Sequence, residues 1–297
     1  MPSLRDIRNR IGSVKSTRQI TKAMKMVAAA KLRRAQEAVL KTRPYAQLLE
    51  QTVARVASRT AGEGKAEAGE PGVHPLLASR PERLAEVVVI TSDRGLAGGF
   101  NSNIARRAQR FLTESGDRFE KLQLTTIGRK GRDYFRARKI QIRKDFTGVH
   151  ADLRYEKAEA IAAEYSRAFL EGEVDAVFLA YNEFKSAISQ KPVVVQLFPI
   201  ATAAAGETSG AAVDFKFEPS AEALAEQLLP RYVAMQVWRA LLESAASEHG
   251  ARMSAMESAT KNAEEMIASL TLQYNRARQA YVTKELMEIV GGAEALK

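Results

Sequence analysis

The chain has 297 residues, of which 45% are hydrophobic and 27% charged, and its formal net charge at pH 7 is +10. Its hydrophobic content excludes an intrinsically disordered protein, and the absence of cysteine excludes disulfides, thiolate metal sites and cysteine nucleophiles. No apolar run approaches about 18 residues, so we expect no transmembrane helix. His74, His150 and His249 lack metal-ligand spacing, and we expect them to be surface residues.

The positive charge is concentrated at the N-terminus. Residues 1–43 contain twelve lysines or arginines and only two acids, Asp6 and Glu37, so the rest of the chain is neutral. Such a segment can bind nucleic acid, lie on an anionic membrane, act as a transit peptide or face an acidic protein. It contains no Phe, Tyr or Trp. This composition favours an acidic protein partner, with nucleic acid as the alternative.

The same N-terminal segment has the pattern of a long helix that packs against a partner helix. Ser3 and Asp6 have the spacing of a capping box at a helix start. Apolar and small residues then follow at intervals of three and four, which is the period of a coiled-coil seam. We predict a helix over residues 1–60, weakened at Gly12 and Pro44. The predicted seam residues are Leu4, Ile7, Ile11, Val14, Thr21, Ala28, Leu32, Ala35 and Val39.

The C-terminus has the same period. No proline interrupts residues 231–290, which as one helix would extend about 90 Å. Its predicted seam residues are Met253, Met256, Thr260, Ala263, Ile267, Leu270, Tyr274, Ala277 and Tyr281. Two long helices at opposite ends of one chain pair most simply as an antiparallel coiled coil. The alternative is two ordinary helices of a bundle.

The middle of the chain changes to an α/β pattern. Residues 61–83 begin with a segment rich in Gly, Ala and Glu and are predicted to form a linker. Strands are predicted at 84–92, 121–127, 174–181 and 192–200, and helices at 102–114 and 155–170. Alternating strands and helices predict a Rossmann-like α/β head over 84–218 with a largely parallel sheet. The C-terminal coiled-coil helix then occupies 219–297.

Residues 92–101, here called the glycine-rich turn, join the first predicted strand to a helix. Glycines followed by a helix N-terminus can hold a phosphate through backbone N–H groups. The spacing matches neither the dinucleotide-binding nor the Walker A pattern, and Asp93 has no second acid beside it. Glycines that only permit a tight turn explain the segment equally well. A small phosphate-binding enzyme therefore remains a third functional class.

Three blocks of the sequence closely resemble the gamma subunit of F-type ATP synthase. The first is ITKAMKMVAAAK at residues 20–31, and the second is SDRGLAGGFN at 92–101. The third comprises ASEHGARMSAM at 246–256, ATKN at 259–262, LQYNRARQ at 272–279 and TKELMEIVGGA at 283–293. The blocks follow the family order and extend over both ends of the chain and the start of the head.

The resemblance implies a central-stalk rotor subunit that transmits torque from a proton-driven c ring to the catalytic beta subunits for ATP synthesis. The implied partners are the alpha, beta, epsilon and c-ring subunits. It implies no catalytic site, cofactor or metal site in this chain. The implied location is the cytoplasmic side of a bacterial inner membrane, held there peripherally by the complex. The Met1–Pro2 start, without a presequence, favours a bacterial gene product.

The resemblance also assigns contact residues. Met24, Arg252, Gln279, Thr283 and Glu285 match rotor positions that contact the beta subunits, and Lys25 and Arg18 are nearby cations that could face beta-subunit acids. Phe217, Glu218 and Pro219 resemble the head segment that faces the c ring. Ala97 stands where many family members have cysteine, and the cysteine-bearing insert of plastid gamma subunits is absent.

Overall fold

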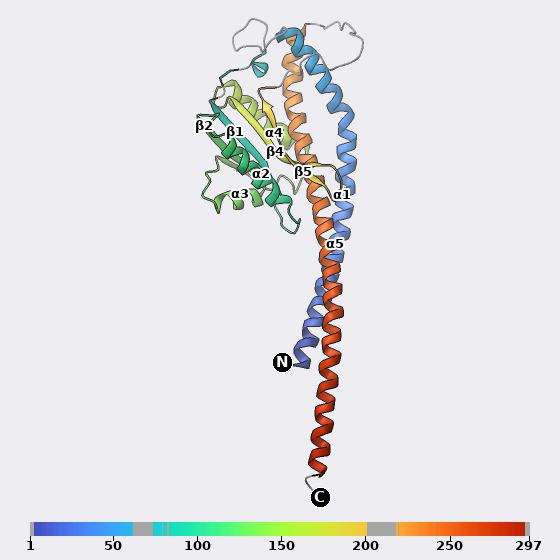
Figure 1. Cartoon of the computed structure of the whole chain (residues 1–297). Coiled ribbons are helices and arrows are strands. Elements are labelled where there is room, and N and C mark those ends of the chain that lie inside the picture. The colour runs from blue at the N-terminus through green and yellow to red at the C-terminus, as the bar shows by residue number, and fades with distance from the viewer. Residues whose placement is uncertain are drawn as a thin grey trace. The chain divides into compact units, whose positions relative to one another are not determined.

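The computed structural model describes residues 3–61, 74–78, 80–81, 83–200, 218 and 220–294 (Figure 1). The chain divides into two compact units. One combines Met1–Ala29 with Arg252–Lys297, and the other is Ala30–Ala251. Each of the two long terminal helices therefore contributes to both units. The four-part division expected from the sequence stays a prediction.

The N-terminal helix, α1, extends over Leu4–Ala61. At its start, the Ser3 hydroxyl accepts a hydrogen bond from the Asp6 N–H at 3.2 Å, and the Asp6 carboxylate accepts one from the Ser3 N–H at 3.1 Å. The hydrogen bonds from the Ser3 side chain and backbone lower the pKa of Asp6. These reciprocal bonds are the predicted capping box. Pro44 lies inside α1 without ending it.

The C-terminal helix, α5, extends over Ala221–Glu294. The sequence predicted a proline-free helix over 231–290. The helix begins ten residues earlier, because it continues through Pro230. The side chains of Leu229 and Val233, on either side of this proline, are buried and fix this part of α5 to the head. Among the helices that the structure describes, none combines the length and the apolar character needed to cross a bilayer.

The head contains a five-stranded sheet in the order β3-β2-β1-β4-β5. Strands β1 (Leu84–Ile90), β2 (Lys121–Ile127), β3 (Lys144–Phe146) and β4 (Ala176–Phe184) are parallel, whereas β5 (Gln190–Phe198) pairs antiparallel with β4. Helices α2 (Phe100–Glu114), α3 (Arg129–Arg136) and α4 (Tyr155–Leu170) connect the parallel strands. The predicted Rossmann-like α/β class is confirmed.

Three elements of the head were not predicted: β3, α3 and the short 3-10 helix η1 (Pro75–Leu77). Strand β3 has only three residues and lies at the sheet edge, so it carries no readable alternation. Helix α3, with the sequence RKGRDYFR, is dominated by charged residues and contains a glycine. The predicted first strand was two residues too long, because β1 ends at Ile90.

The sheet separates two apolar clusters. On strand β1, Val88 and Ile90 belong to one cluster while Val87 and Val89 belong to the other, because successive side chains of a strand point to opposite faces. Helices α2 and α3 supply residues to the second cluster. Helix α4 supplies the first together with residues 46–57 of α1 and 225–241 of α5. Both terminal helices are therefore part of the head core.

A buried acid lies in the middle of β1. Glu86 is 0% exposed, and its carboxylate accepts hydrogen bonds from the Thr125 hydroxyl at 2.5 Å and the Tyr165 hydroxyl at 3.1 Å. The Arg143 guanidinium neutralises it, with 2.9 Å between Nη2 and Oε2. Burial raises the pKa of Tyr165 above its ordinary value. A buried charge is tolerated here because it is both paired and hydrogen-bonded.

Gly128, at the end of β2, occupies a position that only glycine fits. Its φ is +99°, and a Cβ there would lie 2.1 Å from the Thr91 carbonyl oxygen. Thr91 itself is buried, and its hydroxyl donates to the Ile127 carbonyl at 3.1 Å and accepts from the Gly131 N–H at 2.8 Å. Thr91 therefore cannot move away from a Cβ at position 128 without breaking these bonds.

We expect Gly128→Ala to lower the free energy of unfolding of the head by about 3 kcal/mol or more, since it combines backbone strain with overlap of a buried carbonyl. Gly148→Ala is the matched control, because Gly148 also has a positive φ, +74°, but nothing lies within 4 Å of its Cβ position. This control should lose only about 1 kcal/mol. Urea denaturation of both variants is the measurement, and equal losses would contradict the steric account.

Candidate functional site

The unit formed by Met1–Ala29 and Arg252–Lys297 is an antiparallel pair of helix segments. Side-chain contacts between described residues connect them, and as the residue number rises along α1 it falls along α5 by the same amount to within one residue. This fixed relation establishes the antiparallel direction predicted from the sequence. The contacts are Arg8–Tyr274 at 2.7 Å, Arg18–Glu264 at 4.0 Å, Thr21–Thr260 at 2.8 Å and Lys25–Glu257 at 2.6 Å.

An apolar seam lies between the two segments. Ile7 and Ala28 on α1 and Met256, Ala263 and Leu270 on α5 are each 7% exposed or less. The remaining predicted seam residues between 253 and 277 are half-buried, as are Leu4, Ile11 and Val14. The predicted period is therefore confirmed over this length.

The predicted seam is wrong at its last residue. Tyr281 is 58% exposed, and the described side chains from 278 onward are all exposed. The reason is the register, since Arg8 contacts Tyr274 and α1 begins at Leu4. The C-terminal end of α5 thus extends past the start of α1 (Figure 1). The large apolar side chains that are exposed on its described part are Tyr281, Val282, Leu286, Met287, Ile289 and Val290.

The glycine-rich turn, in the other unit, uses its polar groups internally. The Ser92 N–H donates to Asn101 Oδ1 at 2.9 Å, and the Ser92 hydroxyl donates to the Arg94 carbonyl at 2.6 Å. The Asp93 carboxylate accepts from the Arg129 N–H at 3.1 Å and lies 3.6 Å from the Arg129 Nε. These bonds hold the turn to α2 and α3. They agree with the interpretation that the glycines only permit a tight turn.

Helix α5 packs directly on this turn. Ala97 and Phe100 form a small apolar cluster with Ala251 of α5. Asn182 at the end of β4 donates to the Phe100 carbonyl at 3.3 Å and accepts, through its own carbonyl, a bond from the Ser247 hydroxyl at 2.9 Å. The carboxyl end of β1, where nucleotides bind in many parallel sheets, is thus in contact with the chain's own C-terminal helix.

The histidines do not lie where the sequence suggested. Both ring nitrogens of His150 are buried, so the surface prediction is wrong for this residue. Its pKa is lowered by burial, against the opposing charges of Glu248 and Asp93. His74 is half-buried, and its Nδ1 accepts a hydrogen bond from the Leu76 N–H that caps η1. Among the described residues, no group of His, Asp and Glu could hold a metal ion.

Comparison with known proteins identifies the family of the chain. The family model described as ATP synthase matches residues 3–296. An ATP synthase gamma chain from Anaeromyxobacter sp. strain Fw109-5 is 80% identical, and one from Sorangium cellulosum is 48% identical, each with 100% of both chains covered. The chain belongs to the ATP synthase gamma chain family. The resemblance inferred from its three sequence blocks is confirmed.

Solved structures agree with this assignment. The central stalk of the Tetrahymena thermophila mitochondrial ATP synthase matches with a TM-score of 0.61 at 27% identity, covering 81% of this gamma chain and 99% of that chain. A chain of the Euglena gracilis mitochondrial ATP synthase, in rotational state 3, matches with a TM-score of 0.69 at 22% identity. The Euglena match covers 99% of this gamma chain and 94% of that chain, and it supports the fold.

The contact residues assigned by resemblance do not form one site in this gamma chain. Met24 is half-buried, and Lys25 is held by Glu257. Arg252 is half-buried, whereas Gln279, Thr283 and Glu285 are exposed on the end of α5 beyond α1. From Arg252 to Gln279 the helix rises about 40 Å. The residues are therefore distributed along the helix surface. Glu218 is exposed, and Phe217 and Pro219 lie outside the described residues.

Sequence reasoning missed the acids of the helix pair. Glu257 and Glu264 hold Lys25 and Arg18, so part of the N-terminal charge faces α5. The sequence did contain a signal for these ion pairs, because both acids lie opposite cations when the two predicted seams are aligned antiparallel. These exposed ion pairs each contribute at most about 1 kcal/mol, so the apolar seam is the main source of stability.

We expect Leu270→Asp to destabilise the helix pair by several kcal/mol, because it places a charge in the apolar seam. Leu272→Asp is the matched control, since Leu272 lies two residues away and is 53% exposed, against 7% for Leu270. The control should change stability by no more than about 0.5 kcal/mol. Thermal denaturation followed by circular dichroism is the measurement, and equal effects of both substitutions would disprove the seam.

We expect no measurable affinity of the gamma chain for ATP or NAD, because neither phosphate motif is complete and the turn's polar groups bond to one another. Calorimetric titration of the full chain with each nucleotide in the presence of Mg²⁺ is the measurement. A micromolar dissociation constant would instead favour the phosphate-binding alternative.

Proposed function

We propose that this gamma chain is the rotating central shaft of a proton-translocating F-type ATP synthase. It transmits torque between a membrane-embedded c ring and the catalytic beta subunits, in the direction of ATP synthesis or, in reverse, of ATP-driven proton pumping. The observation that carries this proposal is the antiparallel helix pair with its buried seam, found in a chain similar over its full length to ATP synthase gamma chains.

A helix pair of this kind suits the transmission of torque. A single helix twists and bends easily, whereas two helices joined along a packed seam must deform together. Hydrogen bonds such as Thr21–Thr260 hold the register of the two segments, so a rotation applied to one is carried by the other. The exposed apolar end of α5 supplies a surface that a surrounding subunit can contact without an ordered network of polar groups.

The partners in this proposal are the alpha, beta, epsilon and c-ring subunits, with no role for nucleic acid. The Tetrahymena relative was solved as a central stalk with its c ring, which supports the c-ring assignment. ATP chemistry belongs to the beta subunits, so the gamma chain itself needs no catalytic residue and no cofactor. It is held peripherally at the cytoplasmic face of a bacterial inner membrane by its partners.

The contacts follow from the same proposal. Met24, Lys25 and Arg252 contact the beta subunits from the paired part of the shaft, where Lys25 remains accessible beside its partner Glu257. Gln279, Thr283 and Glu285 do so from the exposed end of α5. Phe217 and Glu218 face the c ring from the head. The exposure of Gln279, Thr283 and Glu285 supports their assignment, because a partner can reach their side chains.

Met24→Lys tests the shaft contact in the assembled complex. It places a second ammonium group beside Lys25, where it would attract acidic loops of the surrounding ring through forces that salt only partly screens. We expect ATP hydrolysis to persist while the protons pumped per ATP fall several-fold. The measurement is ATP hydrolysis against ATP-driven acidification in membrane vesicles.

Met26→Lys is the matched control for this experiment. Met26 lies two residues away on α1 and is 61% exposed, so the variant adds the same charge on a different face of the helix. It should couple hydrolysis to pumping normally. Equal coupling in both variants would refute a specific contact at Met24.

Tight, salt-sensitive binding of the wild-type chain to DNA without ring subunits would support the nucleic-acid alternative instead.

A further inference from the structure

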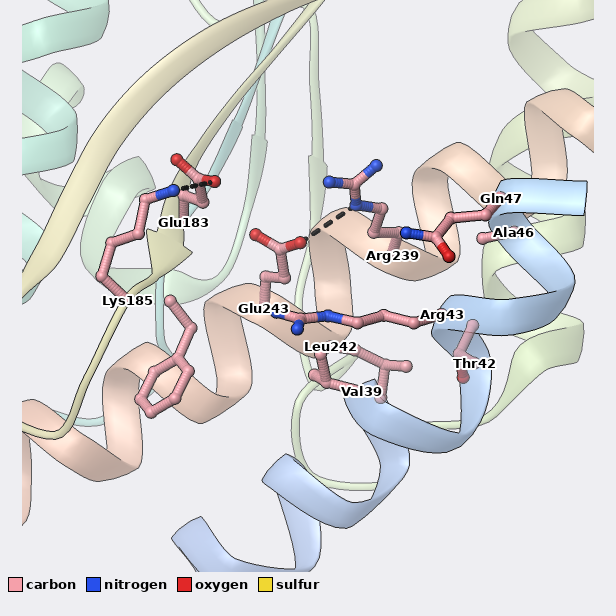
Figure 2. A pocket seen from close by; sticks show the side chains of 11 residues that line it. Val39, Thr42, Arg43, Ala46, Gln47, Glu183, Lys185, Arg239, Leu242 and Glu243 are labelled. Carbon is pink, nitrogen blue, oxygen red and sulfur yellow. Dashed lines mark hydrogen bonds and ion pairs between the residues drawn. The ribbon is translucent and has the colours of Figure 1, made fainter. Parts of the chain in front are cut away.

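A cavity of about 300 Å³ lies between α1, α5 and the end of β4, within the unit Ala30–Ala251 (Figure 2). None of the residues assigned to the shaft contacts lines it. Val39 and Ala46 of α1, Phe184 of β4 and Leu242 of α5 form its apolar part. Its volume is at the lower end of the roughly 300–1,000 Å³ typical of small-molecule sites. A ligand here must therefore be small.

Among the charged side chains that line the cavity, one cation has no acidic partner. Lys185 pairs with Glu183 at 2.7 Å, and the Arg239 Nε pairs with the buried Glu243 at 3.0 Å. Arg43, from the opposite helix, also lines the cavity and forms no ion pair with any residue that the structure describes. The lining therefore has three cations and two acids, and the unpaired cation favours an anionic ligand.

The two arginines have hydrogen-bond donors to spare. Arg239 contacts Glu243 only through Nε, and Figure 2 draws its two terminal nitrogens turned away from that carboxylate. These terminal nitrogens and the whole Arg43 guanidinium have no acceptor among the described residues. Guanidinium groups present paired N–H donors that match the two oxygens of a carboxylate or the oxygens of a phosphate.

We propose that this cavity binds a small amphipathic anion. Its carboxylate or phosphate monoester head lies on Arg43 and Arg239, and a single short apolar body lies against Val39, Ala46 and Leu242. Such a ligand would contact α1 and α5 at once and add a bridge between the two helices at the head. The inference rests on the lining residues and not on the proposed rotor function.

The test uses the full chain and four probes: octanoate, octyl phosphate, octanol and vesicles of an anionic diacyl phospholipid. Calorimetric titration and the thermal denaturation midpoint are the measurements. We expect saturable one-to-one binding of octanoate or octyl phosphate, with a raised midpoint, since a ligand that binds only the folded chain stabilises it. Whichever of these two anions binds with the lower dissociation constant identifies the preferred head group. Equal binding of octanol, or binding to vesicles alone, would overturn the proposal.

Arg43→Gln removes the unpaired cation, and we expect it to weaken binding of the preferred anion about tenfold or more. Arg43 is exposed, so this change should leave the fold intact, as the midpoint without ligand will verify. Lys41→Gln is the matched control, because Lys41 is an exposed cation of the same helix that does not line the cavity. Equal affinity of the two variants would disprove recognition of the anion by Arg43.

Discussion

The structure depends on the fact that neither terminal helix can bury its own apolar stripe. A lone helix with one apolar side is only marginally stable in water, and its stability in a protein comes from packing. In the unit containing both chain ends, residues such as Ile7 and Leu270 are buried where the two segments pair. In the other unit, parts of the same two helices complete one face of the head core. Helix α5 also packs on the glycine-rich turn, and α1 and α5 both line the cavity.

The head shows what this requirement does to an α/β fold. A parallel sheet with a glycine-rich turn after its first strand is an architecture that often holds nucleotides. Here α5 packs on that turn, and Ser92, Asp93 and Asn101 bond to groups of their own neighbourhood. The buried Glu86 is likewise paired and hydrogen-bonded within the fold. The polar residues that attract attention in the sequence mainly hold the head together.

Much of this fold could be predicted because its signals are periodic. The spacing of three and four in both terminal helices is readable over many turns, and β1, β2 and β4 are continuous apolar runs typical of buried strands. What escaped prediction depends on partners distant in sequence. Tyr281 continues the period but has no residue opposite it, Pro230 is held inside a helix by buried neighbours, and α3 contains few apolar residues. The cavity was unpredictable because Arg43, Lys185 and Arg239 meet only in the folded chain.

The sharing of the head core between the two ends of the chain has a consequence for its biosynthesis. Leu49, Val53 and Val56 of α1 pack in the same cluster as Leu229 and Val237 of α5. At a typical rate of about 5–20 residues per second, the ribosome needs roughly nine to thirty-five seconds to make the intervening segment. During that interval the apolar stripe of α1 is exposed to water and to other nascent chains. The interval between making the two ends of this protein is thus a period in which it is vulnerable to aggregation.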